Sequence, residues 1–262
     1  PANPREAYLH ALNQVDLDQS VLGREWKSAG ERVLNDSLFI SLPYAESGYF
    51  HADKAESFSL RFSLKKGRKV LINIVPKDSF QVFADLFMVN NNGTLQPLVF
   101  LKNESQNSME YLARSDGQLL LRLQPELLAS GRYLLSVTTG PSMGFPVAGK
   151  DIRAAHSFWG DPRDGGKRIH KGIDIFAARG TPVIAATDGW ISRTGTNGLG
   201  GKVVWLSTPK QGYTLYHAHL DSQLVLSGNY VKKGDTLGLV GNTGNARTTP
   251  PHLHFGIYAC GS

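Results

Sequence analysis

The spacing of apolar residues in the first 34 positions is that of two short helices. Proline is favourable at a helix start, and the apolar residues that follow Pro4 recur three or four positions apart. Asp18 or Ser20 offers a side chain that can cap a second helix. We therefore predict a helical hairpin over residues 1–35. Its apolar stripes are Tyr8, Leu9, Leu12 and Val15, then Val21, Leu22, Trp26, Ala29 and Val33.

Between residues 36 and 140, apolar and polar residues alternate, which is the spacing of half-buried strands. Phe58, Leu60, Phe62 and Leu64 show the alternation, and glycine-containing turns separate the apolar segments. Several short strands joined by turns favour an antiparallel β-sandwich. The region has no cluster of histidines, cysteines or paired carboxylates, so we interpret it as an accessory domain, either a spacer or a binding module.

The composition changes again at residues 141–152, where prolines and glycines predict a linker. Behind it, glycine is frequent and short apolar segments recur without a helical stripe. We expect strands near 182–186, 189–192, 202–206, 213–216 and 236–240. The sequence thus predicts a mainly β protein whose second β domain covers residues 153–262.

The length, composition and charge of the chain limit the classes of protein to which it can belong. The 262 residues are 41% hydrophobic, which is enough for packed cores, and no apolar run approaches 18 residues, so no membrane span is expected. Residues 1–149 contain 15 Lys/Arg and 15 Asp/Glu, whereas residues 150–262 contain 13 Lys/Arg and 7 Asp/Glu. A basic surface attracts anionic polymers such as nucleic acid, acidic lipid or cell wall. With one cysteine, Cys260, the chain cannot form an internal disulfide.

Histidines gather in this basic third of the chain. Five of the eight, at positions 170, 217, 219, 252 and 254, lie within 85 residues. Histidine with one carboxylate is a ligand set of catalytic zinc sites. His252 and His254 are two apart, so in a strand both project from one face. His170 and Asp174 are four apart with Gly172 between them, which favours a loop entering a strand, and spacing alone does not bring them to the same point.

Residues 153–258 resemble the lysostaphin-type, LytM-like zinc endopeptidases that cut peptidoglycan. The resemblance covers about 40% of the chain and implies the β fold called the duplicated hybrid motif, one zinc ion and peptidoglycan as the substrate. The matching segments are 157–174, with His170-Lys-Gly-Ile-Asp174, then 180–186, Ala218-His-Leu-Asp221, 231–238, 241–245 and Pro251-His-Leu-His-Phe-Gly256.

The resemblance also implies roles for individual residues. His170, Asp174 and His254 match the three zinc ligands, which leaves a fourth position for water. His219 and His252 match the two catalytic histidines. We favour His252 as the base and His219 as the donor to the transition state, and the reverse division stays open.

Three further residues are predicted to contact substrate. His217 stands where the family usually has an aromatic residue, and it shares strand parity with His219, so it could face the groove too. Asn197 and Arg247 belong to glycine-rich loops that we expect to form the walls of a cleft. Arg247 could meet a substrate carboxylate there.

The leading hypothesis is therefore a zinc metalloendopeptidase that hydrolyses stem peptides or cross-links of peptidoglycan. The alternatives are a non-catalytic wall-binding protein or activator of wall hydrolases, and a carrier domain with a similar fold. We expect periplasmic or cell-surface localisation, with any signal or lipid anchor absent from this chain, and no nucleic-acid partner. A D-alanyl–diaminopimelate bond is our preferred scissile bond. The sequence does not give the oligomeric state, or show whether the N-terminal segment inhibits the site.

Overall fold

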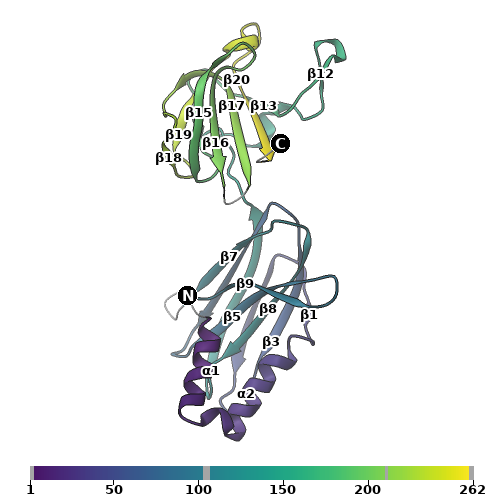
Figure 1. Ribbon diagram of the computed structural model, residues 1–262, viewed down its shortest axis with the longest axis vertical. Coiled ribbons are helices and arrows are strands. Elements are labelled where there is room, and N and C mark those ends of the chain that lie inside the picture. Colours follow the sequence, from purple (N-terminus) through teal and green to yellow (C-terminus); the bar gives the residue numbers. More distant parts are fainter. Residues whose placement is uncertain (1–2, 103–106, 210–211, 260–262) are drawn as a thin grey trace. The chain divides into compact units, whose positions relative to one another are not determined.

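The chain folds into two compact units, Pro1–Ser142 and Met143–Ser262. The structure is a computed structural model that describes residues 3–102, 107–209 and 212–259 (Figure 1). Cys260 lies outside these described residues. In the described part, no helix is long and apolar enough to cross a membrane.

The first unit is a sandwich of two sheets. One sheet has the strand order β1-β3-β8-β5-β6 and the other β2-β9-β4-β7. Neighbouring strands run antiparallel, apart from β1 and β3, which run parallel. The strands are β1 (Leu38–Phe39), β2 (Tyr44–Phe50), β3 (Phe58–Leu64), β4 (Arg68–Pro76), β5 (Val82–Val89), β6 (Leu95–Phe100), β7 (Ser108–Leu112), β8 (Gly117–Pro125) and β9 (Gly131–Pro141).

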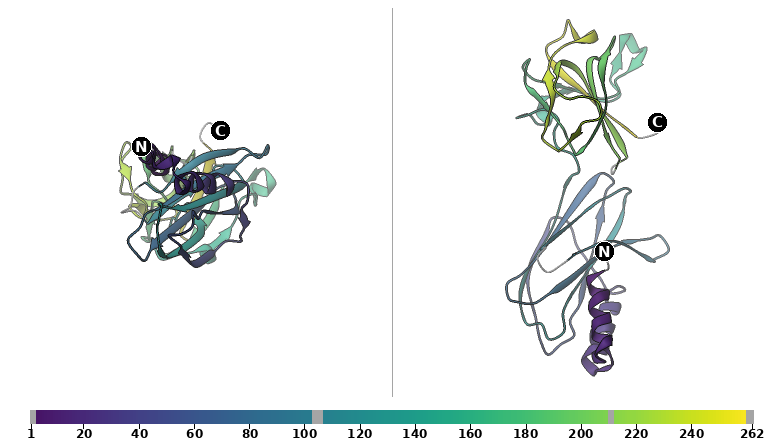
Figure 2. Two further views of the ribbon diagram at one scale, coloured as in Figure 1. Left: turned by 90° about the horizontal axis from the view of Figure 1, so that it is seen from below. Right: turned by 60° about the vertical axis from the view of Figure 1, so that its left-hand side comes forward.

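The two faces of β8 are both buried, and this explains where the helices lie. Leu119, Leu121 and Leu123 point into the sandwich core, as the alternating pattern predicts. The intervening residues Arg122 and Gln124 are also buried, because the hairpin of α1 (Pro4–Gln14) and α2 (Val21–Arg32) covers the outer face of this sheet (Figure 2).

Polar contacts fix this helical hairpin to the sheet. Trp26 donates its indole N–H to the Pro125 carbonyl over 2.7 Å, and Gln124 donates to the Trp26 carbonyl over 2.7 Å. Arg122 pairs with Asp85 at 2.6 Å, and its guanidinium also donates to the Gly30 carbonyl of α2. The buried polar groups of β5 and β8 are thus satisfied by each other and by the helices.

The second unit is built around one strongly bent sheet. Its main strand order is β10-β13-β20-β17-β16-β15-β18, and β19 pairs with both β14 and β17. A separate hairpin, β11–β12, projects from this sheet (Figure 1). The strands are β10 (Ala155–Ser157), β11 (Pro162–Arg163), β12 (Arg168–Ile169), β13 (Ile173–Phe176), β14 (Pro182–Ile184), β15 (Gly189–Asn197), β16 (Gly201–Thr208), β17 (Tyr213–Gln223), β18 (Tyr230–Val231), β19 (Thr236–Val240) and β20 (His252–Ala259).

The predicted mainly β architecture with an N-terminal helical hairpin is confirmed. The helices belong to the first compact unit, because their apolar side chains pack on β5, so no boundary between units falls at residue 35. The division falls at Ser142, within the predicted linker. Most of that segment is structured: Gly144 donates to the Ala186 carbonyl and Ala148 to the Pro182 carbonyl, which joins it to the second unit.

We predict that Asp85→Ala destabilises the first unit by about 3 kcal/mol, because it leaves the buried Arg122 charge unpaired. Urea unfolding of the whole chain, followed by circular dichroism, measures the change. Lys65→Ala is the control, since Lys65 pairs with Asp116 on the exposed surface and should cost at most about 1 kcal/mol. Equal effects of the two substitutions would contradict this account of the helix docking.

Candidate active site

The register between β13 and β20 places the predicted ligands side by side. Asp174 is directly opposite His254 in the antiparallel ladder, and Phe176 is opposite His252. Alternation sends the residues between them, such as Ile175 and Leu253, into the core, where both are fully buried. The sequence therefore needs only this one strand pairing to gather a carboxylate and two imidazoles on the open face of the sheet.

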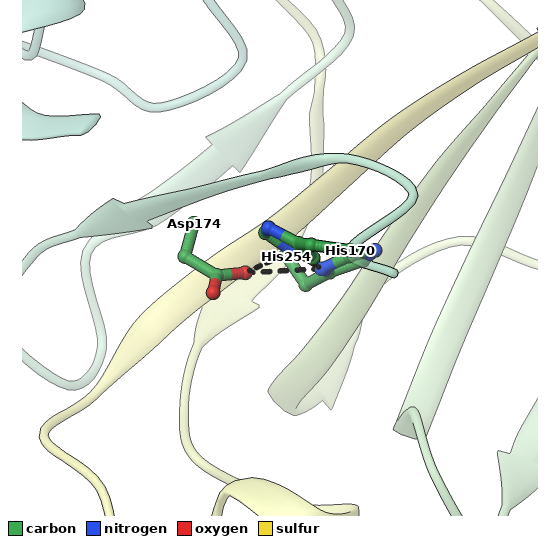
Figure 3. A group of neighbouring side chains, drawn as sticks. All are labelled: His170, Asp174 and His254. Atoms are coloured by element: carbon green, nitrogen blue, oxygen red, sulfur yellow. Dashed lines mark hydrogen bonds and ion pairs between the residues drawn. The ribbon is translucent and has the colours of Figure 1, made fainter. Parts of the chain in front are cut away.

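His170 completes a cluster of three metal-ligating side chains (Figure 3). Its Nε2 lies 2.9 Å from Nδ1 of His254 and 3.1 Å from Oδ1 of Asp174. The Nδ1 atom of His254 lies 3.0 Å from the same carboxylate oxygen. Three potential ligand atoms from two strands and one loop thus form a small triangle.

This triangle fits a tetrahedral metal ion. With bonds of about 2.0–2.1 Å to nitrogen and oxygen, two ligands of tetrahedral zinc lie about 3.3 Å apart. The three observed separations are within a few tenths of an ångström of that spacing. Two histidine nitrogens and one carboxylate oxygen are also a donor set that zinc accepts. The residues present therefore fit a bound divalent ion.

The backbone fixes which nitrogen of His170 is available. Its Nδ1 lies 3.0 Å from the Phe158 carbonyl, so this nitrogen carries the proton and donates, and the Nε2 lone pair is directed at the cluster. Gly172 allows the loop to pass close behind, because a Cβ at that position would lie 2.5 Å from the Phe255 carbonyl oxygen and 2.9 Å from the His254 ring. Burial lowers the pKa of His170, which keeps the ring neutral as a ligand must be.

Asp174 is held by a residue from the projecting hairpin. Arg163 donates to Oδ2 of Asp174 over 2.9 Å and also to the Ser157 hydroxyl, so Oδ1 remains directed at the two imidazoles. Burial alone would raise the pKa of Asp174, but the hydrogen bond from His254 and the surrounding histidine charges outweigh it and lower the pKa to about 2. The carboxylate is therefore ionised at neutral pH.

His219 reaches the same face through a β-bulge. Its backbone has a φ of 62°, in the left-handed region that few residues other than glycine adopt. The ladder between β16 and β17 shifts register at this point, between the pairs Val204–His217 and Lys202–Leu220. The bulge places the centre of the His219 ring 5.0 Å from the centre of the His252 ring and 5.9 Å from that of the His254 ring.

His219 and His252 are oriented in the same way. Nδ1 of His219 lies 2.9 Å from the Thr243 carbonyl, and Nδ1 of His252 lies 2.9 Å from the Pro250 carbonyl. Each Nδ1–H therefore donates to the backbone, which leaves each Nε2 free to exchange a proton. Burial, followed by the charge of His252, lowers the pKa of His219 to about 4.

These residues line a groove of about 1110 Å³. The volume exceeds that of most small-molecule pockets. The floor contains the ligand cluster and both remaining histidines, while Tyr216, Phe176 and Tyr258 supply aromatic surface. The arrangement suits an extended chain lying across a metal-assisted hydrolytic site.

Comparison with known proteins agrees with this geometry. Residues 168–262 match the model of peptidase family M23. Most of the second unit therefore resembles an M23 peptidase domain. The chain is 37% identical over 122 residues to the L-Ala–D-Glu endopeptidase of Bacillus subtilis, and the match covers 44% of this chain and 37% of that protein. It is 39% identical over 94 residues to the peptidoglycan DD-endopeptidase ShyC of Vibrio cholerae, covering 36% of this chain and 21% of the relative.

A solved structure, the catalytic domain of lysostaphin from Staphylococcus simulans, shares 33% sequence identity with a TM-score of 0.37, covering 40% of this chain and 79% of that domain. The chain spans less than half the length of the two curated relatives named above.

The structure does not place His217 in the groove, where we predicted that it would contact substrate. His217 is fully buried, pairs with Val204 and Phe255 across the sheet, and donates to the Val204 carbonyl. The parity argument failed because the bulge lies between His217 and His219 and turns only the second residue to the open face. His217 is thus a core residue of the sheet.

Asn197 and Arg247 lie beside the groove without lining it. Asn197 accepts a hydrogen bond from the Gly200 N–H over 2.6 Å and so shapes the loop that forms one wall. Arg247 is exposed at the end of the loop that contributes Asn245 and Ala246 to that wall. Neither residue is among the described residues that line the groove, and substrate contact by either one stays a prediction.

Sequence reasoning missed two groups that orient the site. Arg163, which holds Asp174, lies within the matching segment 157–174, but nothing in its spacing marks it as a partner of the carboxylate. The Thr243 carbonyl, which fixes His219, is a backbone atom and has no sequence signal. Both depend on the tertiary structure.

We predict that His217 makes stability depend on pH. Burial lowers its pKa to about 4, whereas the unfolded value is about 6.5, so the unfolded chain binds more protons between these values. The free energy of unfolding should fall as the pH drops from 6.5 towards 4, and His217→Phe should remove about 2 kcal/mol of that loss at pH 5.

Denaturant unfolding at pH 7.5 and pH 5 measures this difference. The control is His156→Phe, because His156 is exposed in the same unit and its replacement should leave the difference between the two pH values unchanged. An unchanged pH dependence in His217→Phe would show that the ring is not neutral in the core.

Proposed function

We propose that this protein is a zinc-dependent endopeptidase that hydrolyses peptide bonds in peptidoglycan stem peptides or cross-links. The observation that carries the proposal is the convergence of His170, Asp174 and His254 within 3.1 Å of one another, with two further histidines in the same groove. The names of the M23 relatives, which include endopeptidases of peptidoglycan, support the substrate class.

In this proposal, Nε2 of His170, Nδ1 of His254 and Oδ1 of Asp174 would hold one zinc ion. The ion would supply a water whose pKa is lowered to about 7 and would polarise the scissile carbonyl group. Arg163 maintains the geometry, because its bond to Oδ2 keeps the carboxylate from rotating away from the imidazoles.

His219 and His252 handle the protons of the reaction. Nε2 of one ring accepts the proton that the attacking water loses, and the same proton later moves to the nitrogen of the departing amine. Nε2 of the other ring donates to the oxygen of the scissile carbonyl, and for this the ring must carry a second proton. Free His219, with a pKa of about 4, is neutral at pH 7, so the negative charge that develops on that oxygen must raise its pKa in the reacting complex. The rings are 5.0 Å apart, so both can reach one peptide unit. His252 Nε2 is 3.9 Å from Asp174 Oδ1, which favours His252 as the base next to the metal.

Peptidoglycan lies outside the cytoplasm, so the proposed substrate requires periplasmic or cell-surface action. The sandwich of the first unit remains a spacer or a wall-binding module in this proposal. A purely non-catalytic role is disfavoured because the ligand triangle and both proton-handling histidines are present together.

We predict that His170→Ala, Asp174→Ala and His254→Ala each lose both bound zinc and peptidase activity. Each change removes one of three ligands, and an ion with two protein ligands is held much more weakly. Metal analysis of the dialysed proteins and digestion of purified peptidoglycan provide the measurements. Full activity in wild-type protein stripped of metal by a chelator would overturn the proposed chemistry.

We predict that replacing either of the other two histidines lowers activity without loss of zinc. His219→Ala and His252→Ala should retain about one zinc ion per chain, while kcat falls by about 10²–10⁴-fold, because proton transfer is lost and the ligands are intact. Muropeptide release measured by mass spectrometry gives the rate and identifies the bond. Loss of zinc in either variant would assign that histidine to the ligand set instead.

A further inference from the structure

The two long walls of the groove differ in charge. The wall formed by the β11–β12 hairpin and the loop that follows it contains Arg163, Lys167, Arg168 and Lys171. The opposite wall contains Leu199, Gly200, Asn245, Ala246 and Thr249, none of which is charged. The asymmetry does not follow from the overall charge, because the net charge of the whole chain is only +6.

The two lysines of the basic wall lack a counter-charge among the described side chains. Asp174 carries the one carboxylate among the described groove-lining residues, and this carboxylate is occupied by Arg163 and the two histidines. Among the described side chains, neither Lys167 nor Lys171 lies within ion-pair distance of a carboxylate. Lys171 directly follows His170 in the chain, and both residues line the groove.

We propose that Lys167 and Lys171 select substrates that carry a free carboxylate next to the scissile bond. The inference rests on the proposed peptidase function and specifies its substrate class: acidic, unamidated stem peptides in preference to amidated stem peptides and neutral glycine bridges. Lys167 and Lys171 are specificity residues in this proposal, and the uncharged wall accommodates the neutral backbone of the same peptide.

Electrostatics supports this assignment. A groove lined on one side by positive charge raises the local concentration of an anionic ligand and orients it before contact. A hydrogen bond between an ammonium group and a carboxylate is stronger than one between neutral groups. An amidated peptide offers a neutral donor and acceptor instead, and it leaves both ammonium groups without a counter-charge. We expect the selectivity to exceed about tenfold in kcat/KM.

The test compares two substrates that share one scissile bond. One is a cross-linked stem-peptide dimer, joined by a D-alanyl–diaminopimelate bond, with its diaminopimelate and D-glutamate carboxylates free. The other is the same dimer with these carboxylates amidated. Wild-type protein should cleave the acidic dimer with at least about tenfold higher kcat/KM, and the preference should shrink as salt concentration rises. The double variant Lys167→Gln/Lys171→Gln should lower the ratio about tenfold, with zinc content unchanged.

Lys232→Gln is the matched control, because this lysine lies at the end of β18, outside the groove lining, and its loss should leave the ratio unchanged. Binding of both dimers to His252→Ala separates recognition from turnover. Tighter binding of the acidic dimer would support recognition by the two lysines, whether or not the dimer is cleaved. A failure of wild-type protein to cleave either dimer would count against the proposed peptidase function alone. Equal cleavage of both dimers by wild-type protein, or equal binding of both dimers to His252→Ala, would overturn the proposed selection by charge. Neither result would contradict the proposed peptidase function.

Discussion

The pairing of β13 with β20 is the constraint on which the site depends. It sets Asp174 opposite His254, and it buries Ile175 and Leu253 on the other face, so a slip of one residue would bury the carboxylate and expose the core. Hydrophobic burial therefore enforces the register that the chemistry needs. Holding an ionised carboxylate 3.0 Å from an imidazole in a buried position is costly unless cationic partners surround it. Arg163 supplies one such partner, and a metal ion would supply the second.

A local departure from regular strand geometry brings His219 to the same face as the metal-ligating cluster. If β17 continued its regular alternation, His219 would share the core face with His217. The left-handed conformation at His219 and the register shift beside it interrupt that alternation. Strain of this kind persists where surrounding structure holds it, and here the Thr243 carbonyl does so by accepting a hydrogen bond from Nδ1–H of His219. The strand thus presents Ala218 and His219 on one side of the bulge and buries His217 on the other.

These two features show how far the sequence could be interpreted. Strand parity was sufficient for His252 and His254, because they lie in one uninterrupted strand. It failed for His217, because a bulge has no signature in a single sequence when the residue that adopts positive φ is not glycine. The meeting of His170 with Asp174 could be stated from the family resemblance but not from spacing, since the intervening loop has no regular period. The buried Arg122 and Gln124 were likewise hidden, because alternation predicts an exposed face and the covering helices come from 90 or more residues earlier.

The packing of the helical hairpin bears on regulation of the site. The apolar side of the hairpin is already covered, since Leu12 and Trp26 pack against Phe83 of the sandwich. Its backbone carbonyls at Trp26 and Gly30 accept hydrogen bonds from Gln124 and Arg122, and moving the hairpin would leave those buried donors unsatisfied. The N-terminal segment is therefore committed to the first unit as a structural cover. Within the second unit, the β11–β12 hairpin borders the groove and orients Asp174 through Arg163.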